Sequence, residues 1–192
     1  MKLIILDHNG VISQSSSTFI KTPDEWIPIP GSLEAISRLT HNGYRVVIAT
    51  NQSGIGRGLL DIKTFNAIND KMHKAINQAG GRIDAIFFCP HTGADKCRCR
   101  KPATGMFEEI MQRYGVDLKN VPAIGDSLRD LQAAVAIGAT PILVLTGKGQ
   151  KTSTNVQIPP DTQIFDDLEK VVPVDLRKQY DIREIIARLV DG

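Results

Sequence analysis

The sequence predicts an α/β fold built on a doubly wound, Rossmann-like parallel sheet. Two observations carry this prediction. Short apolar runs recur along the chain, and they are continuous instead of alternating with polar residues, which is typical of strands covered on both faces. Between them lie segments in which apolar residues recur with helical spacing. A repeated strand–helix–strand order favours a parallel sheet with helices on both sides.

The runs predicted to form strands are Leu3–Leu6, Tyr44–Ala49, Ala85–Phe88, Val121–Ile124 and Pro141–Leu145. In open parallel sheets, ligands bind beyond the carboxyl ends of the strands. The residues that directly follow each run are therefore expected to carry the function.

The predicted helices are Ser32–His41, Ile62–Gln78, Gly105–Tyr114 and Leu128–Ile137. Capping and stop signals support their ends, for example Asp61 before the second helix and Gly115 after the third. The polar segment Lys148–Pro160 is expected to be a loop. Leu176–Val190 is expected to form a short helix within a C-terminal arm that starts at about residue 170.

The bulk properties favour a globular protein of one domain over residues 1–192. A net charge of +2 gives no reason to expect nucleic acid or a membrane surface as a partner. No apolar run approaches the ~20 residues of a membrane span, and the N-terminal run is too short for a signal peptide. We therefore expect a monomeric cytoplasmic enzyme or binding protein.

Polar groups follow four of the predicted strands. They are Asp7, the segment TNQSGIGRG at 50–58, the segment CPHTGADKCRCRKP at 89–102 and the segment GDSLRD at 125–130. Each is common by itself, as a turn former, a polar loop or a helix start. Their combination at one edge of a sheet indicates a site.

Phosphoryl transfer is the chemistry that fits these groups. The carboxylate of Asp7 can attack phosphorus and hold it as an aspartyl phosphate. Mg²⁺ bound by Asp7 and Asp126 would neutralise the approach of one anion to another. Thr50 and the backbone N–H groups of its loop can bind phosphate oxygens, and Lys101 adds a positive charge.

The three cysteines lie close together in the third of these segments. With one histidine they form a Cys₃His set, the ligand type of tetrahedral Zn²⁺: Cys89, His91, Cys97 and Cys99. A structural Zn²⁺ would shape the loop 89–99 and aim Arg100 and Lys101 at a substrate. The alternative is three buried cysteines without a metal.

The order of these motifs, LDxxG, Thr50, Lys101 and GDSxxD, resembles the haloacid dehalogenase superfamily of phosphatases over nearly the whole chain. No insertion is long enough for a large cap domain, so the chain resembles the capless members. TNQSGIGRG, the cysteine loop and GDSLRDLQAA resemble the D-glycero-D-manno-heptose 1,7-bisphosphate 7-phosphatases more closely. The sister family of histidinol-phosphate phosphatases shares the zinc loop and usually differs where Ser53 stands.

The resemblance implies Mg²⁺-dependent hydrolysis of the C7 phosphate of a heptose bisphosphate, a small-molecule phosphosugar used in the supply of lipopolysaccharide core. The catalytic residues it implies are Asp7, Asn9, Thr50 and Lys101. The Mg²⁺ ligands it implies are Asp7, the Asn9 carbonyl and Asp126. The substrate contacts it implies are Ser15, Thr18, Thr50, Asn51, Gln52, Ser53, Arg100, Lys101 and Ser127. Arg57 would meet a second phosphate or cover the loop.

Asn9 departs from the resemblance, which implies an Asp that acts as general acid and then as general base. Asn9 keeps the backbone carbonyl but cannot transfer this proton, and losing such help costs ~10²–10⁴ in rate. His8, Ser13 and Ser15 depart too, which favours natural divergence over an engineered trap. His8 as a replacement acid would require it to face the site, whereas a residue between two site positions tends to face away.

Two further alternatives concern the same position. The Asn9-Gly10 sequence is prone to deamidation, which would restore the acid in part of the molecules. A catalytically silent phosphosugar-binding protein is the other alternative. A zinc-centred interaction module is disfavoured, because it has no need of Asp7, Thr50, Lys101 and Asp126.

Overall fold

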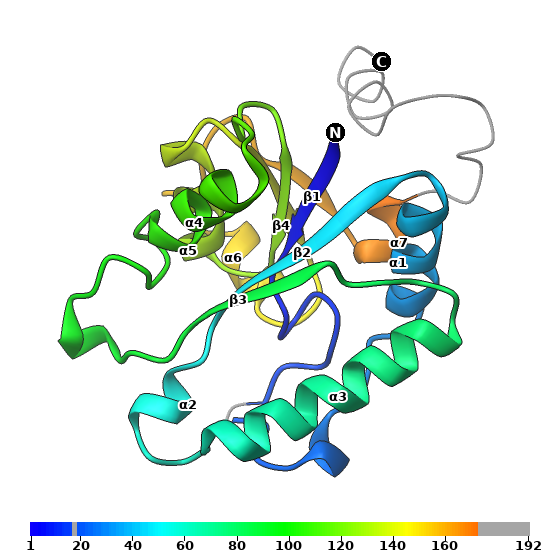
Figure 1. Cartoon of the computed structure of the whole chain (residues 1–192). Helices are drawn as coiled ribbons and strands as arrows, with labels where there is room; N and C mark the ends of the chain where they lie inside the picture. Colours follow the sequence, from blue (N-terminus) through cyan, green and yellow to red (C-terminus); the bar gives the residue numbers. More distant parts are fainter. Residues whose placement is uncertain (17–18, 173–192) are drawn as a thin grey trace.

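The computed structural model describes residues 1–16 and 19–172. Its centre is a parallel sheet of six strands in the order β3-β2-β1-β4-β5-β6 (Figure 1). The strands are β1 (Lys2–Leu6), β2 (Tyr44–Asn51), β3 (Ala85–Cys89), β4 (Pro122–Gly125), β5 (Thr140–Val144) and β6 (Gln163–Phe165). The chain reverses its winding direction at the β1–β4 pair, and ligand sites of such sheets lie beyond this point.

Helices cover both faces of the sheet, as the doubly wound prediction requires. One face packs against α1 (Ser32–His41), α3 (Ile62–Gln78) and α7 (Leu168–Val171), and the other against α4 (Gly105–Tyr114) and α5 (Leu128–Ala136). β1 serves both cores, because Ile4 and Leu6 point to the first and Leu3 and Ile5 to the second. This burial on both faces explains why its sequence is a continuous apolar run.

The structure confirms the fold class, the five predicted strands and the four predicted helices, with ends shifted by at most two residues. It adds β6, α7 and the four-residue α2 (Ser53–Gly56). The part of the predicted C-terminal arm beyond Val172 lies outside the described residues. The helix predicted over Leu176–Val190 is in that part.

The prediction of a loop over Lys148–Pro160 is wrong in part, because α6 (Gly149–Ser153) forms there. This helix has no apolar period that a sequence pattern could detect. Contacts hold it instead: the hydroxyl of Thr152 donates to the backbone oxygens of Lys148 and Asp126, at 3.1 and 2.8 Å.

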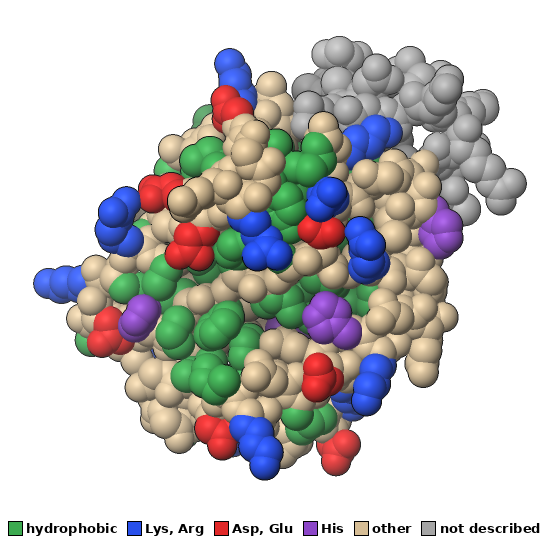
Figure 2. All heavy atoms as spheres, viewed as in Figure 1, with side chains coloured by type: hydrophobic (Ala, Val, Ile, Leu, Met, Phe, Trp, Pro, Cys, Tyr) green, Lys and Arg blue, Asp and Glu red, His purple; other side chains and the backbone are tan. Residues whose placement is uncertain are grey.

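Charged side chains of both signs are interspersed over the face shown in Figure 2. Within residues 1–16 and 19–172, no helix is both long enough and apolar enough to cross a membrane.

Candidate active site

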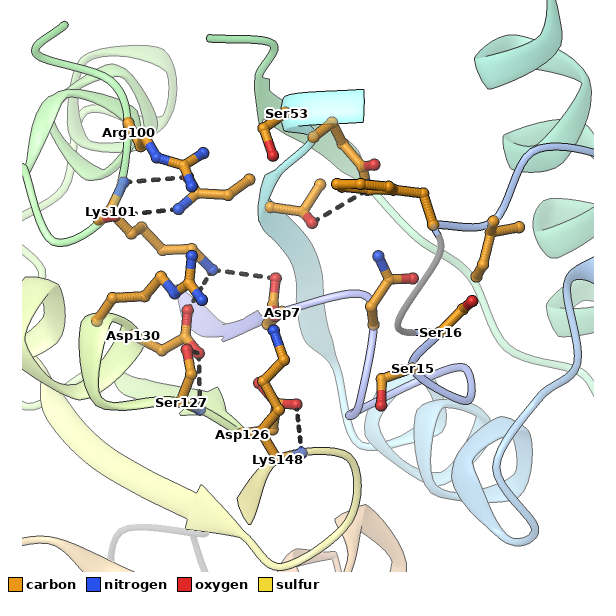
Figure 3. A pocket seen from close by; sticks show the side chains of 17 residues that line it. Asp7, Ser15, Ser16, Ser53, Arg100, Lys101, Asp126, Ser127, Asp130 and Lys148 are labelled. Atoms are coloured by element: carbon orange, nitrogen blue, oxygen red, sulfur yellow. Dashed lines mark hydrogen bonds and ion pairs between the residues drawn. The ribbon is translucent and has the colours of Figure 1, made fainter. Parts of the chain in front are cut away.

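A pocket opens at the carboxyl ends of β1, β2 and β4 (Figure 3). It is lined by Asp7, Asn9, Ser15, Ser16, Phe19, Ile20, Thr50, Asn51, Gln52, Ser53, Arg100, Lys101, Asp126, Ser127, Arg129, Asp130 and Lys148. The described residues predicted for catalysis, Mg²⁺ and substrate therefore come together in one place. Thr18 lies outside the described residues, and Arg57 does not line the pocket.

Lys101 is the buried cation of this pocket. Its Nζ lies 3.0 Å from Asp7 Oδ1, 2.6 Å from Asp130 Oδ1 and 2.6 Å from the carbonyl oxygen of Ala49. Burial alone would lower the pKa of Lys101, but attraction to Asp130 and Asp7 outweighs it and raises the pKa. The side chain therefore stays protonated and holds the Asp7 carboxylate in a fixed direction.

Asp130 ends the segment 125–130 that was predicted to lie at the site, but no individual role was predicted for it. It stands in the first turn of α5 and accepts hydrogen bonds on Oδ2 from the N–H and the hydroxyl of Ser127, a capping box. Burial would raise the pKa of Asp130, but Lys101 lowers it below its usual value. The motif GDSxxD could have predicted this capping box, because an acid in the first turn of a helix commonly accepts a hydrogen bond from the residue that caps the helix.

Asp126 is fixed by the loops after β1 and β5, which meet at its carboxylate. The backbone N–H of Lys148 donates to Oδ2 at 2.8 Å. Gly10 (φ 88°) and Gly147 (φ 58°) approach so closely that a Cβ on either would lie 2.1 or 2.3 Å from this oxygen. Both positions need glycine for space and for the left-handed backbone. The loop after β5 thus belongs to the site. This segment was predicted as a polar loop, and its part in the site was not predicted.

Three carboxylates share this small volume with one buried cation. Single oxygens of Asp7, Asp126 and Asp130 can be chosen that lie within 4.8 Å of one another. Burial, followed by repulsion from Asp7 and Asp130, raises the pKa of Asp126 to about 7, and burial raises the pKa of Asp7 as well. Oxygen donors and excess negative charge fit a hard divalent cation. Asp7 and Asp126 are the better ligands, because both oxygens of Asp130 are engaged, Oδ1 by Lys101 and Oδ2 by Ser127, whereas Lys101 contacts Asp7 through Oδ1 alone.

The carboxyl end of β2 supports Lys101 from a second side. Asn51 Nδ2 donates to the carbonyl of Lys101 at 3.0 Å, and the Lys101 N–H donates to Asn51 Oδ1 at 3.1 Å. The buried hydroxyl of Thr50 accepts from Gln52 Nε2 at 3.3 Å. Asn51 therefore orients Lys101, and its predicted contact with substrate stays a prediction, as does that of Ser127.

His8 and Asn9 occupy different surroundings although they are neighbours. His8 is 2% exposed and its Nε2 accepts a hydrogen bond from Trp26 Nε1 at 2.9 Å. Burial lowers its pKa to about 4. The interpretation that this residue faces away from the site is confirmed. Asn9 lines the pocket, and its Oδ1 accepts from the hydroxyl of Ser13 at 3.3 Å.

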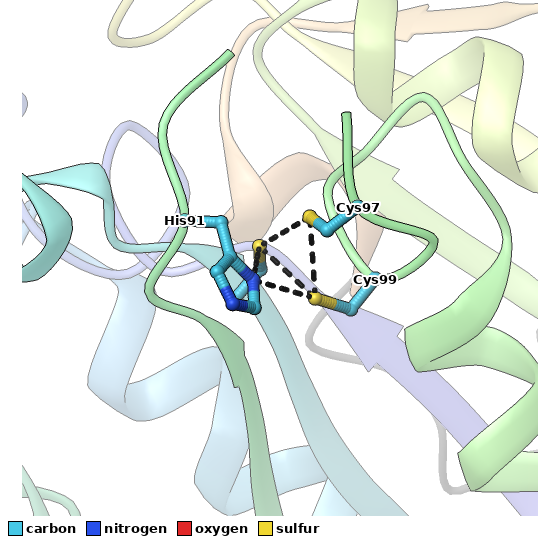
Figure 4. Close-up of side chains that lie close together, drawn as sticks. His91, Cys97 and Cys99 are labelled. Atoms are coloured by element: carbon cyan, nitrogen blue, oxygen red, sulfur yellow. Dashed lines mark hydrogen bonds between the residues drawn. The ribbon is translucent and has the colours of Figure 1, made fainter. Parts of the chain in front are cut away.

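The cysteine loop forms a second cluster beside the pocket (Figure 4). The Sγ atoms of Cys89, Cys97 and Cys99 lie 3.2–3.6 Å apart, and His91 Nδ1 lies 3.6 Å from Cys89 Sγ and 3.3 Å from Cys99 Sγ. Four ligands at about 2.3 Å from a tetrahedral zinc would lie about 3.8 Å from one another. The cluster fits Zn²⁺ with a slight expansion, and Arg100 and Lys101 follow it directly.

Comparison with known proteins identifies the relatives of this chain. A protein of Bordetella bronchiseptica named D-glycero-beta-D-manno-heptose-1,7-bisphosphate 7-phosphatase is 58% identical over 89% of this chain and 96% of its own length. The chain belongs to this family of haloacid dehalogenase-like phosphatases. Two further phosphatases of this name, from Neisseria meningitidis and Pseudomonas aeruginosa, are 52% and 48% identical over 88% of the chain. These alignments span 91% and 94% of the length of the two relatives.

Family models and solved structures agree with this membership of the haloacid dehalogenase-like phosphatases. A model described as polynucleotide kinase 3 phosphatase matches residues 3–129, and one described as HAD-hydrolase-like matches residues 98–171. The crystal structure of D,D-heptose 1,7-bisphosphate phosphatase from B. bronchiseptica, complexed with magnesium and phosphate, has a TM-score of 0.87 at 52% identity. It covers 100% of this chain and 99% of its own. The chain is thus a phosphoric monoester hydrolase.

Proposed function

We propose that this phosphatase removes the C7 phosphate of D-glycero-β-D-manno-heptose 1,7-bisphosphate in a Mg²⁺-dependent reaction. The observation that carries the proposal is the Asp7 carboxylate, held 3.0 Å from Lys101 Nζ in the pocket that Asp126 also lines. The names of the relatives supply the substrate, and the B. bronchiseptica structure is described as a complex with magnesium and phosphate.

Asp7 acts as the nucleophile. One of its oxygens bonds to phosphorus while the bond from phosphorus to the sugar oxygen breaks, which leaves an aspartyl phosphate. Lys101 and the Thr50 loop stabilise the charge on the phosphate oxygens. Mg²⁺ held by Asp7, Asp126 and the Asn9 carbonyl would neutralise further negative charge when bound. Water then attacks phosphorus, the bond to Asp7 breaks, and inorganic phosphate leaves.

Asn9 sets the rate of both steps in this proposal. The departing sugar oxygen needs a proton, and the attacking water must lose one. The Asn9 amide does neither, because it neither releases nor accepts a proton near neutral pH, so solvent water must protonate the sugar oxygen and take up the proton of the attacking water. His8 does not replace it, because its Nε2 is bound to Trp26 in the core. We therefore propose a slow enzyme whose phosphosugar and Mg²⁺ sites are intact.

A phosphate-release assay on heptose 1,7-bisphosphate with Mg²⁺ tests this proposal in the wild type and in Asn9→Asp. The expected result is a gain of about 10²–10⁴ in the variant, and Asp7→Ala should release no phosphate. Peptide mass analysis of the wild-type sample shows whether its rate comes from Asn9 itself or from molecules deamidated at this position. No gain in Asn9→Asp would contradict the role given to this residue.

Side-by-side assays of histidinol phosphate and heptose 1,7-bisphosphate with the Asn9→Asp variant test the alternative substrate of the sister family. Turnover of histidinol phosphate above that of the heptose bisphosphate would overturn the proposed substrate. A silent phosphosugar-binding homologue would bind either ligand with no turnover in the wild type. We also propose that the enzyme is a cytoplasmic monomer in heptose supply for lipopolysaccharide core, and light scattering of the full chain tests the monomer.

A further inference from the structure

We propose that Arg129 and Lys148 form a second anion subsite that binds the phosphate which the reaction leaves on the sugar. This inference rests on the proposed function, since it needs a substrate with two phosphate groups. Its ligand class is a sugar carrying a phosphate monoester at each end. The subsite would favour such a bisphosphate over a sugar with the transferred phosphate alone.

The two residues stand where the active-site pocket continues into a neighbouring groove. Ser127, Arg129 and Lys148 line both hollows, and Lys151 and Gln132 line the groove alone. A ligand that starts at Asp7 and extends past Asp126 would therefore pass these cations. Figure 3 shows Lys148 beside Asp126, whereas Arg100 enters beside Lys101.

Each of the two cations comes from a fixed backbone. Arg129 lies in the first turn of α5, two residues after the Ser127 that forms the capping box with Asp130. The Lys148 N–H is bound to Asp126, and its carbonyl accepts from the Thr152 hydroxyl. Among the described residues, neither side chain makes a direct hydrogen bond or ion pair, although Lys148 attracts Asp126 and Arg129 attracts Asp130 from a longer distance. Both heads are thus available to a ligand.

The charges of the pocket also call for a second anion. Asp7, Asp126 and Asp130 face the ammonium of Lys101, and a divalent cation would balance the two remaining negative charges. The charge of a transferred phosphate dianion would then be balanced by the cations at the edge of the pocket, which we call the rim. Arg100, Arg129 and Lys148 together exceed this dianion by one charge, so the rim is still positive after the first phosphate is bound.

Two other arginines are weaker candidates for the second phosphate. Arg100 donates through Nη1 to the carbonyl of His91 at 3.0 Å, which ties its head to the zinc loop. Arg57 does not line the pocket. Arg129 and Lys148 are therefore the cations at the pocket edge whose heads make no direct hydrogen bond or ion pair with another described residue.

The test compares heptose 1,7-bisphosphate with heptose 7-phosphate, with Mg²⁺, in an Asn9→Asp background. The readout is the ratio of kcat/KM for the two substrates, so that effects on the shared chemistry cancel. Arg129→Gln and Lys148→Gln should each lower this preference about 10- to 100-fold, the loss expected for one charge-assisted contact. Arg129→Lys should retain most of it. Arg113→Gln, an exposed site on α4, is the matched control and should leave the ratio unchanged.

A binding measurement separates this inference from the proposed function. Calorimetry on Asp7→Asn with Mg²⁺ compares the affinities of the same two sugars without turnover. A preference for the bisphosphate that falls in Arg129→Gln and Lys148→Gln supports the subsite even if neither sugar is hydrolysed. Three results would overturn the subsite and leave the proposed hydrolysis standing. They are turnover with no preference for the bisphosphate, an unchanged preference when Arg129→Gln and Lys148→Gln are combined, and a preference that is lost only in Arg100→Gln.

Discussion

The ammonium of Lys101 lies 2.6 Å from the carboxylate of Asp130, and both side chains are almost completely buried. The pair joins the loop after β3 to the first turn of α5. Because the same ammonium also reaches Asp7, the carboxylate proposed as the nucleophile is oriented by a residue 94 positions away in the chain.

Lys101→Met should destabilise the protein by about 3–5 kcal/mol at neutral pH, because it leaves Asp7 and Asp130 buried without their cation. Urea unfolding of the metal-free protein measures this loss. It should shrink as the pH falls and the carboxylates take up protons. Lys74→Met, at an exposed site of α3, is the control. A change below about 0.5 kcal/mol in Lys101→Met would show that the buried pair does not stabilise the fold.

Asp126 should make the stability of the metal-free protein depend on pH. Its pKa is raised to about 7 by burial and the neighbouring carboxylates, so between about pH 4 and 7 the folded protein keeps a proton that the unfolded chain releases. The free energy of unfolding should therefore fall as the pH rises through this window, relative to Asp126→Asn, by up to about 4 kcal/mol. Added Mg²⁺ should oppose the loss, most strongly above pH 7. Parallel curves for the two proteins would refute this assignment.

Removal of zinc should loosen the loop 89–99 and lower activity through Arg100 and Lys101, which follow it. Cys97→Ser should lose bound zinc, measured by elemental analysis, and should be cut faster by protease in this loop. Ala94→Ser changes an exposed residue of the same loop and should keep both properties. Equal zinc content in the two variants would mean that Cys97 is not a ligand.

His8 should stay neutral down to about pH 5, because burial lowers its pKa to about 4. Its Nε2 accepts from Trp26, so the proton should sit on Nδ1. Nitrogen NMR, with the signal assigned by its loss in His8→Gln, measures both the tautomer and the titration. A pKa near 6.5 would return His8 to the candidates for the missing acid.

The sequence was a good guide where one local pattern dominates. The buried strands could be predicted from their apolar runs. Helix α3 could be predicted from the spacing of its apolar residues and from Asp61, whose side chain accepts from the Thr64 N–H at 2.7 Å. The residues after the strands could be grouped because parallel strands end at one edge. These signals depend on neighbours in the chain and need no tertiary information.

The missed features depend on contacts between distant segments. α6 is held by Thr152 and Asp126, and the engagement of Asp130 follows from where Lys101 comes to rest. The orientation of His8 away from the site was predicted, but its hydrogen-bond partner Trp26, 18 residues further along the chain, was not. Such pairings are decided by packing, and no periodicity in the chain records them.

The hydroxyl of Thr146 donates to the carbonyl of Gly10 across 136 positions of sequence. During synthesis the catalytic turn therefore emerges long before the residue that fastens it. At 5–20 residues per second this delay is roughly 7–27 s. We expect the Asp7 turn to be among the last parts of the nascent chain to reach its final shape, because a ribosome stalled before Thr146 would have made five of the six strands but not the residue that fixes this turn.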